Sequence, residues 1–511
     1  MPSALKVSVV VPVYNPGDHI DDLLASFDAQ TLAPDAFEAV LVDDGSTDGT
    51  GERLDAWAAE RPWAVVEHIP NSGWPGTPRN VGLGLAHGEY VLFADNDDWL
   101  DPEALERLHA RAVADDADVV VPKTVGHGKM VPRGVFRTDR REVPLDWEPL
   151  LRLLSPHKLF RRALLEEHGI RFPDGKVRLE DHLFVMHAYF HAARISVLAD
   201  HPIYHWALRH GHNASATFDP AAYYRDLRRV LDLIDEHVEP GELRDHLHAH
   251  WYRSKVLKRA GGSNLADRAP EEQRAMHREL VAIAAERFPD RLDARLVLTG
   301  RIRSALLRRG DLDALLRWAV VEREYTAVAE HTDVVPDGAD LLVSVEARLG
   351  GEHGPLRLRQ AGDRLEWVPP AEVAELLAGI DLDVSRDRER DWLEVFVRSI
   401  ERRTELPLAP SREERLEPLE DGLVTPVLSA QARLSTDGER PLPPGDWVVV
   451  LLPRIAGFLP TAKRVADAGG DLVVVADEDG VELRDGWKRT LSRRAPGLVG
   501  RVRRLSQAAR R

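Results

Sequence analysis

Cysteine is absent from the 511-residue chain, so neither disulfide bonds nor thiolate metal ligands can contribute to its fold or chemistry. Long apolar runs are also missing. The apolar segment Val7–Val13 is far shorter than the roughly 18 residues that a membrane helix needs. It also lacks the charged flank and the cleavage site of a signal peptide. These absences predict a location in the cytoplasm.

Positive charge is scarce overall, because 85 acidic residues outnumber 68 basic ones and leave a net charge of −17. A chain of this sign is not expected to bind nucleic acid. The balance is reversed at residues 488–511, which hold nine Lys and Arg and no Asp or Glu. We interpret 491–511 as a basic tail that contacts an anionic surface, such as the inner face of the membrane. A solvated terminus is the alternative interpretation.

Alternating strand and helix patterns run through residues 1–219. Apolar runs typical of buried strands occur at Val7–Val13, Phe37–Asp43, Trp63–Ile69, Tyr90–Ala94 and Asp118–Pro122. Helical spacing of apolar residues occurs between them, at Asp18–Gln30, Glu52–Glu60 and Pro102–Asp115. This alternation predicts an α/β domain with a mostly parallel sheet and helices on both faces. Ligands of such domains bind beyond the carboxyl ends of the strands.

Three further regions follow this α/β domain. Residues 220–322 keep helical spacing and are predicted to form a helical linker. From residue 323 onward apolar residues alternate with polar ones, which predicts short strands. We expect two β-sandwich modules, at 323–412 and 413–490, ahead of the basic tail.

Acidic residues follow two of the predicted strands. Asp95 and Asp97 stand two positions apart after one strand, and carboxylates so spaced suit Mg²⁺ or Mn²⁺ and ribose hydroxyls. Asp43 and Asp44 end another strand, where a carboxylate can accept a nucleobase N–H. An acidic turn is the alternative for the first pair, and a helix cap is the alternative for the second.

The loop at 71–80 combines glycines with Arg79 at a predicted helix start. Glycines allow the backbone to approach a ligand closely, and an arginine beside helix-end amides suits a phosphate. A simple turn is the alternative for this loop taken alone. Its occurrence together with both acidic strand ends in one βα framework favours a nucleotide site.

Two further polar clusters are candidates for catalysis. Glu180 and Asp181 precede a predicted helix, and a paired carboxylate can supply the general base for an acceptor hydroxyl. A favourable charge pair at a helix N-terminus is the alternative. His212 is a candidate metal ligand if a diphosphate–metal site lies nearby, whereas a structural or exposed histidine is the alternative.

Four cations and no anion gather within the linker segment 251–259. They could contact successive phosphodiesters of a polyanionic acceptor, and a solvated helix face is the alternative. These residues are Arg253, Lys255, Lys258 and Arg259.

Three strand-end motifs, at 9–15, 42–48 and 93–98, resemble in combination and order the signatures of family-2 glycosyltransferases. That resemblance implies the nucleotide-diphospho-sugar, or GT-A, fold. A narrower resemblance covers most of the first 320 residues and points to the poly(ribitol-phosphate) N-acetylglucosaminyltransferases that decorate wall teichoic acid. It is carried by the segments 71–80, 154–159, 180–181 and 194–198.

The narrower resemblance implies roles for three carboxylates. In that family the second Asp of the strand-two pair, here Asp44, contacts uracil. The last Asp of the D-x-D motif, here Asp97, contacts Mn²⁺, and the Asp of the Glu-Asp pair, here Asp181, is the base. The family also implies immunoglobulin-like C-terminal modules that form trimers. Trp74 departs from the pattern, because a small residue is expected in that loop, and this departure leaves the donor sugar open.

These features together predict an inverting, metal-dependent transferase that moves a sugar from a UDP-sugar to a hydroxyl of a cell-wall polyol-phosphate polymer. By resemblance the sugar is GlcNAc. Asp97 and His212 are expected to hold Mn²⁺ or Mg²⁺, and Asp181, paired with Glu180, is expected to take the acceptor proton. The donor is expected to bind across the strand ends and the glycine loop, at Pro12, Tyr14, Asp44, Asn71, Arg79 and Asp95.

Three alternative functions stay open at this point. The first is a transferase that uses a different UDP-hexose on another envelope polysaccharide. The second is a nucleotidyltransferase, which needs a Gly-rich basic loop after the first strand that residues 14–19 do not supply. The third is a non-catalytic carbohydrate-binding scaffold, which the intact Asp95, Asp97 and Asp181 disfavour.

Overall fold

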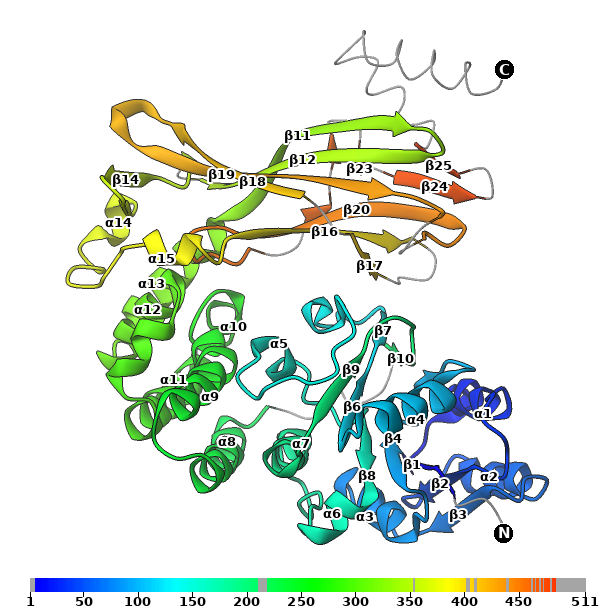
Figure 1. The fold of residues 1–511 in the computed structure, drawn as a ribbon. Coiled ribbons are helices and arrows are strands. Elements are labelled where there is room, and N and C mark those ends of the chain that lie inside the picture. Colours follow the sequence, from blue (N-terminus) through cyan, green and yellow to red (C-terminus); the bar gives the residue numbers. More distant parts are fainter. Residues whose placement is uncertain are drawn as a thin grey trace, which may run out of the picture. The chain divides into compact units, whose positions relative to one another are not determined.

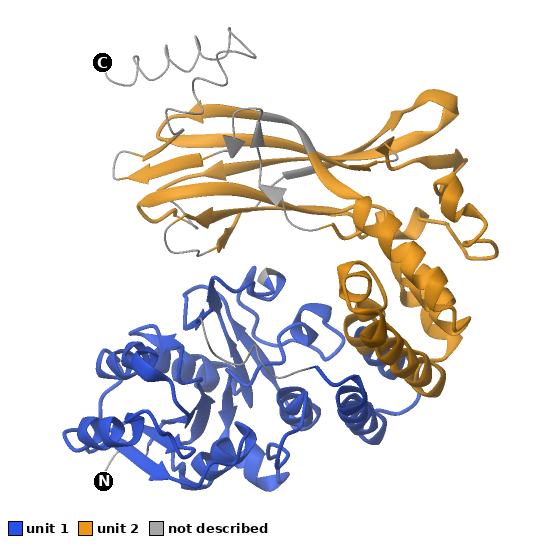
Figure 2. Cartoon of the chain, turned by 180° about the vertical axis from the view of Figure 1, so that it is seen from behind, with its two compact units in different colours: residues 1–250 blue, residues 251–511 orange. Residues whose placement is uncertain are grey.

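The computed structural model describes residues 5–209, 218–352, 354–400, 405–408, 411–437 and 441–460, with short stretches between 463 and 483. The chain forms two compact units, Met1–His250 and Trp251–Arg511 (Figure 2). No helix in these described ranges combines the length and the apolar character that crossing a bilayer requires.

A seven-stranded mixed sheet forms the centre of the first unit, in the order β3-β2-β1-β4-β8-β6-β9 (Figure 1). Four neighbouring pairs are parallel, and β8 runs against both of its neighbours. The mostly parallel sheet and its five predicted strands are confirmed, whereas β8, with three residues, is too short to leave a pattern. The strands are β1 (Val7–Val13), β2 (Phe37–Asp43), β3 (Ala64–His68), β4 (Tyr90–Phe93), β6 (Val119–Pro122), β8 (Leu159–Arg161) and β9 (Ile195–Leu198).

Helices cover both faces of this sheet. The odd-numbered valines of β1 pack in one core with Leu23 of α1 (Ile20–Asp28) and Leu105 of α4 (Ala104–Asp115). Val10 faces the other side, where α3 (Gly76–Leu85) contacts β1 and β2. A Cβ at Gly82 would lie 2.4 Å from Val10 Cγ1, so α3 approaches the sheet this closely because position 82 is glycine.

The remaining helices of the first unit include α7, which carries Glu180 and Asp181 in its first turn. They are η1 (Gly17–His19), α2 (Thr50–Ala58), η2 (Arg133–Phe136), α5 (Glu148–Leu151), α6 (Arg162–Glu167), α7 (Glu180–His191) and α8 (Pro220–His237). Helix α2 begins two residues earlier than the predicted start at Glu52. Gly49 adopts a left-handed φ of 87°, and the Asp48 carboxylate accepts the Thr50 N–H at 3.1 Å, so the cap lies at Asp48-Gly49.

A small second sheet, in the order β5-β10-β7, completes the first unit. It comprises β5 (Trp99–Leu100), β7 (Thr124–His127) and β10 (Tyr204–Ala207). Because β5 follows the acidic segment after β4, its pairing with β10 brings Tyr204 to the carboxyl end of the main sheet.

The second unit begins with helices and continues into sheets. Helix α9 (Glu242–Trp251) meets a π-helical turn, η3 (Tyr252–Val256), at the boundary between the two units. The helices that follow are η4 (Leu257–Ala260), α10 (Ser263–Ala266), α11 (Pro270–Arg287), η5 (Asp290–Arg295), α12 (Leu298–Arg308) and α13 (Leu312–Glu324).

Antiparallel strands form two main sheets in the second unit, and these pack against each other through β16 with β19 and β12 with β25 (Figure 1). One sheet contains β11 (Thr326–Asp337), β12 (Asp340–Gly351), β13 (Gly354–Pro355), β14 (Leu358–Ala361), β15 (Arg364–Trp367), β18 (Ser411–Pro418) and β19 (Val424–Leu434). The other contains β16 (Trp392–Ser399), β17 (Glu405–Pro407), β20 (Gly445–Arg454), β21 (Lys463–Arg464), β24 (Val473–Asp477) and β25 (Gly480–Leu483).

Short elements complete this region, namely α14 (Ala371–Ala374), α15 (Ser385–Arg388), η6 (Glu420–Gly422) and the pair β22 (Ala466–Asp467) and β23 (Gly470–Asp471). The predicted alternation is confirmed, because Leu341, Val343, Val345 and Ala347 of β12 are buried and the residues between them are half-buried. The predicted boundary at 412 falls inside β18. Both sheets draw strands from either side of it, as β12 pairs with β19 and β16 with β20.

Candidate active site

A buried arginine joins two of the predicted site carboxylates. Arg79 lies in the first turn of α3 with only 4% of its surface exposed. Its Nη2 donates to Asp95 Oδ1 and its Nη1 donates to Asp181 Oδ1, both at 2.9 Å. Opposite charges on both sides compensate the buried guanidinium and keep it protonated. Arg79 therefore fixes the second residue after β4, Asp95, and the first turn of α7 at one point.

Burial and neighbouring charges give the carboxyl groups of this centre different pKa values. Burial raises the pKa of Glu180 to about 7, and the adjacent Asp181 adds to the rise while Arg79 opposes it. Burial also raises the pKa of Asp181, again against the effect of Arg79. Burial disfavours the ionised form of Asp95 as well, yet His157 and Arg79 hold its pKa well below the usual range. One anionic and two more basic carboxyl groups thus share the centre, as acid–base chemistry requires.

A hydrogen-bonded network extends from Asp95 into the protein. His157 Nε2 lies 3.0 Å from Asp95 Oδ2, and its ring stacks on Tyr204 with 4.4 Å between centroids. The Tyr204 hydroxyl accepts the Asp95 N–H at 3.0 Å and donates to Asp98 Oδ2 at 2.7 Å. Burial, with Asp95 nearby, raises the pKa of the fully buried Asp98 to about 7. This network holds the acidic segment after β4 in one conformation.

The sheet register explains how His157 reaches Asp95. Strand β8 runs antiparallel to β4, with Leu92 opposite Leu159 and Tyr90 opposite Arg161. Continued by two residues, this register sets position 157 opposite position 94, beside Asp95. Lys158 follows and is fully buried, and burial lowers the pKa of its amine to about 7.

The predicted nucleobase-binding residues surround the ends of β1 and β2. Asp44 is buried and accepts two hydrogen bonds from Ser72, at 2.7 Å from its N–H and 2.9 Å from its hydroxyl. A Cβ added at Gly45 would lie 2.8 Å from the backbone nitrogen of Asn71. The glycine loop therefore lies directly against the end of β2. Pro12 is buried within β1, and Tyr14 is 47% exposed beside it.

Trp74 occupies the same loop, beside the Glu180 side of the centre. Lys176 and Arg178 both lie over its ring, at 5.8 and 5.3 Å from the centroid. Its indole nitrogen is buried and lacks a well-aligned acceptor among the described residues, although it is near enough to Glu180 to lower that carboxyl's pKa. A large aromatic ring flanked by cations thus borders the candidate base.

The oxygen-rich segment after β4 fits a hard divalent cation. The ligand atoms of Asp95, Asp98 and His157 lie within 4.8 Å of one another, but hydrogen bonds to Arg79 and Tyr204 already engage this set. Asp97, half-buried in the same segment, stays the predicted ligand. Its predicted partner, His212, lies outside the described residues.

The predicted acceptor-binding cations lie in the second unit, on η3 and η4 rather than on one continuous α-helix. Lys258 is exposed, and Arg253, Lys255 and Arg259 are half-buried. Burial lowers the pKa of Lys255 to about 8, with Arg259 and Lys258 adding to the effect.

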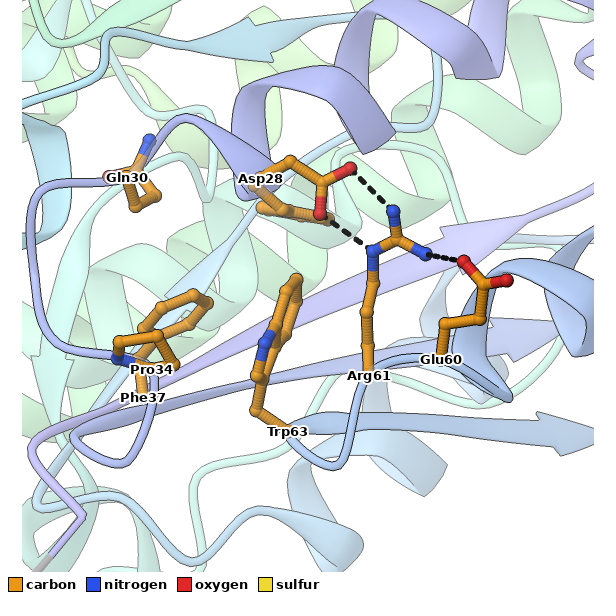
Figure 3. Close-up of a pocket in the computed structure, with 8 residues that line it drawn as sticks. Asp28, Gln30, Pro34, Phe37, Glu60, Arg61 and Trp63 are labelled. Carbon is orange, nitrogen blue, oxygen red and sulfur yellow. Dashed lines mark hydrogen bonds and ion pairs between the residues drawn. The ribbon is translucent and has the colours of Figure 1, made fainter.

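A separate hollow of about 300 Å³ lies at the opposite edge of the main sheet, where β2 and β3 begin (Figure 3). Arg61 closes one side of it through two hydrogen bonds to Asp28, at 2.6 and 2.9 Å. Ligands of parallel α/β sheets bind at the carboxyl edge, so this hollow is not the donor site. Its lining residues are Phe27, Asp28, Gln30, Pro34, Phe37, Glu60, Arg61 and Trp63.

Comparison with known proteins identifies the family. Residues 8–197 match the model of glycosyl transferase family 2, and residues 220–319 match the glycosyl transferase TarS linker domain. The crystal structure of Staphylococcus aureus TarS 1–349 in complex with UDP-GlcNAc aligns with a TM-score of 0.56 and 30% identity. That alignment covers 69% of this chain and 98% of the other. The chain belongs to glycosyltransferase family 2.

Two curated relatives of this family-2 member have names that describe transfer to ribitol-phosphate polymers. The poly(ribitol-phosphate) beta-N-acetylglucosaminyltransferase TarS of S. aureus is 33% identical over 324 residues, which cover 63% of this chain and 56% of TarS. The poly(ribitol-phosphate) beta-glucosyltransferase of Bacillus spizizenii is 36% identical over 233 residues, which cover 45% of this chain and 37% of that enzyme. The chain thus spans about half the length, or less, of these relatives. The crystal structure of S. aureus TarS shares the fold over 94% of this chain, with a TM-score of 0.55 and 23% identity.

Sequence reasoning about this family-2 glycosyltransferase missed the supporting residues of its site. Asp95, Arg79 and Asp181 were expected, but not that one arginine bonds both carboxylates across 102 residues of sequence. His157 and Lys158 belong to a motif that resembled the family, and that motif was their only signal. Asp98 belongs to the motif at 93–98, but its pairing with Tyr204 had no signal, because that pairing depends on a sheet that local patterns do not predict.

Proposed function

We propose that this chain is an inverting glycosyltransferase that moves GlcNAc from UDP-GlcNAc to a hydroxyl of a poly(ribitol-phosphate)-type cell-wall polymer. One observation carries the proposal. Arg79 bonds both Asp95, at the sheet edge where nucleotide ligands bind, and Asp181, the candidate base. A base held this close to the donor edge is what transfer to an acceptor hydroxyl requires.

Asp181 is the proposed general base. Its carboxylate takes the proton of the acceptor hydroxyl while that oxygen bonds to C1 of the sugar. The bond from C1 to the UDP oxygen breaks on the opposite face, so the anomeric configuration inverts. The raised pKa of Asp181 makes it a stronger base than an ordinary aspartate, and Arg79 fixes the direction in which its second oxygen points.

The donor is proposed to lie along the ends of β1, β2 and β4. Asp44, already oriented by Ser72, is placed to accept a uracil N–H, with Tyr14 and Asn71 beside it. Asp97, with His212 as its expected partner, would hold Mn²⁺ or Mg²⁺, and the bound cation would neutralise the departing diphosphate.

UDP-glucose is the second candidate donor, because the glucosyltransferase of B. spizizenii shows the higher identity over the region it shares. Trp74 is the residue to test for this choice, since it borders the candidate base. We expect Trp74→Ser to change the ratio of kcat/KM for the two donors by about tenfold, the effect of one altered pocket contact. An unchanged ratio would remove Trp74 from donor selection.

Two further proposals concern the rest of the chain. The antiparallel sheets of the second unit are proposed to form homotrimers, as the sequence resemblance to the poly(ribitol-phosphate) N-acetylglucosaminyltransferases implies. Peripheral contact with the inner membrane face is proposed for the basic tail at 491–511, which lies outside the described residues. Light scattering of the full chain and flotation with anionic vesicles test these two proposals.

The central experiment is a donor screen with Mn²⁺ and a poly(ribitol-phosphate) acceptor, followed by linkage analysis of the product. We expect transfer from UDP-GlcNAc with a β-linked product. Transfer with retention, or no transfer from any UDP-sugar to this polymer, would contradict the proposal. UDP-sugar hydrolysis without transfer would leave the donor site but overturn the acceptor class.

A further inference from the structure

Four histidine rings gather at the end of α7 that lies away from the acidic centre. His187 and His191 stand four positions apart on α7 and therefore share one face of the helix. His237 lies in the last turn of α8, and α7 packs against α8 within the first unit. His168 stacks on His191, with 3.9 Å between ring centroids.

Three of these rings direct ligand atoms toward one point. The ligand nitrogens of His187, His191 and His237 all lie within 4.8 Å of one another. The Nε2 atoms of His191 and His237 are 3.3 Å apart. Two imidazole nitrogens on a tetrahedral zinc ion, each at about 2.0–2.1 Å, are separated by about 3.3 Å. The pair therefore already has the spacing that a shared zinc ion imposes.

The surroundings of His237 determine which of its ring nitrogens carries a proton. Its Nδ1 lies 2.9 Å from the Leu233 carbonyl oxygen, which can only accept, so Nδ1 carries the proton. This leaves Nε2, which faces His191, as the ring nitrogen available to a metal ion. A ligating histidine commonly donates its other N–H to a backbone carbonyl in this way. Phe190 stacks on the same ring at 5.0 Å and holds its plane.

We propose that His187, His191 and His237 form a zinc-binding site that joins α7 to α8. Imidazole ligands suit Zn²⁺ better than they suit the Mg²⁺ or Mn²⁺ expected on carboxylates. Three protein ligands leave the fourth tetrahedral position to water. The bound ion links α7, whose first turn contains Asp181, to α8, the first helix of the linker.

This site is distinct from the acidic centre. His187 stands six positions after Asp181, which corresponds to about 9 Å along the helix axis. The inference does not rest on the proposed function, because a zinc site between two helices is independent of the donor and the acceptor.

The test is zinc binding by the full-length protein after treatment with a chelator. Millimolar Mg²⁺ and UDP are added to occupy the carboxylate site, and Zn²⁺ is titrated in competition with a chromophoric chelator. We expect one Zn²⁺ per chain with submicromolar affinity and a higher Tm. We also expect Co²⁺ at this site to give the visible absorption of a tetrahedral complex.

Variants distinguish zinc binding at the histidine cluster from adventitious zinc binding elsewhere on the protein. His191→Ala and His237→Gln should each weaken Zn²⁺ binding at least tenfold and abolish the Co²⁺ absorption. His87→Ala, which removes a histidine with a 74% exposed side chain outside the cluster, should change neither. Circular dichroism checks folding, and His237→Gln, at the end of a helix, keeps the test valid if His191→Ala misfolds. Wild-type zinc affinity in a folded His237→Gln protein, or no zinc binding by the wild type, would overturn the proposal.

Discussion

The charged residues around Arg79 and the cations between 253 and 259 differ in how deeply they are buried and in the charges beside them. In the first unit Arg79 is almost fully buried, and two carboxylates bond it at 2.9 Å. In the second unit the cations between 253 and 259 range from half-buried to exposed, and burial, with Arg259 and Lys258 nearby, lowers the pKa of Lys255 to about 8. A buried, paired charge positions a reacting group, whereas a loose cluster of like charges attracts a polyanion at long range. The predictions below separate these two uses of charge.

The largest effect is expected from Asp181→Asn. The amide has nearly the shape of the carboxylate but cannot take the acceptor proton, so kcat should fall by about 10²–10⁴-fold. The affinity for UDP, measured by calorimetry, should stay within about twofold. Asp28→Asn, at the opposite edge of the sheet, is the matched control and should keep its activity. A folded Asp181→Asn protein with near wild-type turnover would show that the base is another group.

A smaller loss is expected from Arg79→Lys. One ammonium group cannot bond Asp95 and Asp181 through two separate nitrogens as the guanidinium does, so kcat should fall by about 10–100-fold. Arg79 also opposes the rise in the pKa of Asp181. With a weaker partner that pKa rises further, and since the base must be ionised, the acid limb of the pH–rate profile should move to higher pH.

The control for that profile is Arg61→Lys, which makes the same change in an arginine that bonds Asp28. Its profile should match the wild type. An acid limb that stays in place in Arg79→Lys would show that Arg79 does not act on the base.

These outcomes bear on what local sequence can predict. The valine runs of β1 and β2 and the acidic residues after β4 are local signals, so the strands and Asp95 were predictable. Strand β8 has three residues, and its register with β4 is what carries His157 to Asp95. In the second unit the alternation in β12 predicted its buried face but not its partner, β19, whose paired residues lie 81 to 93 positions further along the chain. Local residue patterns predict which face of a strand is buried. Pairing between residues far apart in the sequence determines which strands are neighbours in the sheet.

Lys255→Met tests the loose cluster through stability. The pKa of Lys255 is about 8 in the folded chain, below its usual 10.5. The unfolded chain therefore binds more protons between pH 8 and 10.5, and the wild type gains stability as pH rises through that window. Below pH 8 the half-buried charge costs its full penalty. Lys255→Met should raise the free energy of unfolding at pH 7 by about 1–2 kcal/mol, given ~1.4 kcal/mol per pKa unit and some remaining hydration.

The advantage of Lys255→Met should shrink between pH 7 and pH 9, as urea unfolding at both values will show. Lys258→Met is the matched control, because Lys258 is exposed and its loss should leave the pH dependence unchanged. Equal slopes in Lys255→Met and the wild type would show that Lys255 is hydrated in the folded chain.

The smallest effect is expected from Lys258→Glu, which tests whether the cluster attracts the acceptor. One exposed charge acts over about a Debye length of 8–10 Å, so reversing it should raise KM for a poly(ribitol-phosphate) acceptor by two- to threefold at low salt, on the order of a rim-charge effect. The change should vanish at about 0.5 M salt, and it should be absent with a short neutral acceptor. Arg359→Glu reverses an exposed charge on β14 and is the control for net charge alone. An equal rise in KM for both variants, or for the neutral acceptor, would reject the cluster as an acceptor surface and leave Arg79 and its carboxylates as the functional charges of this chain.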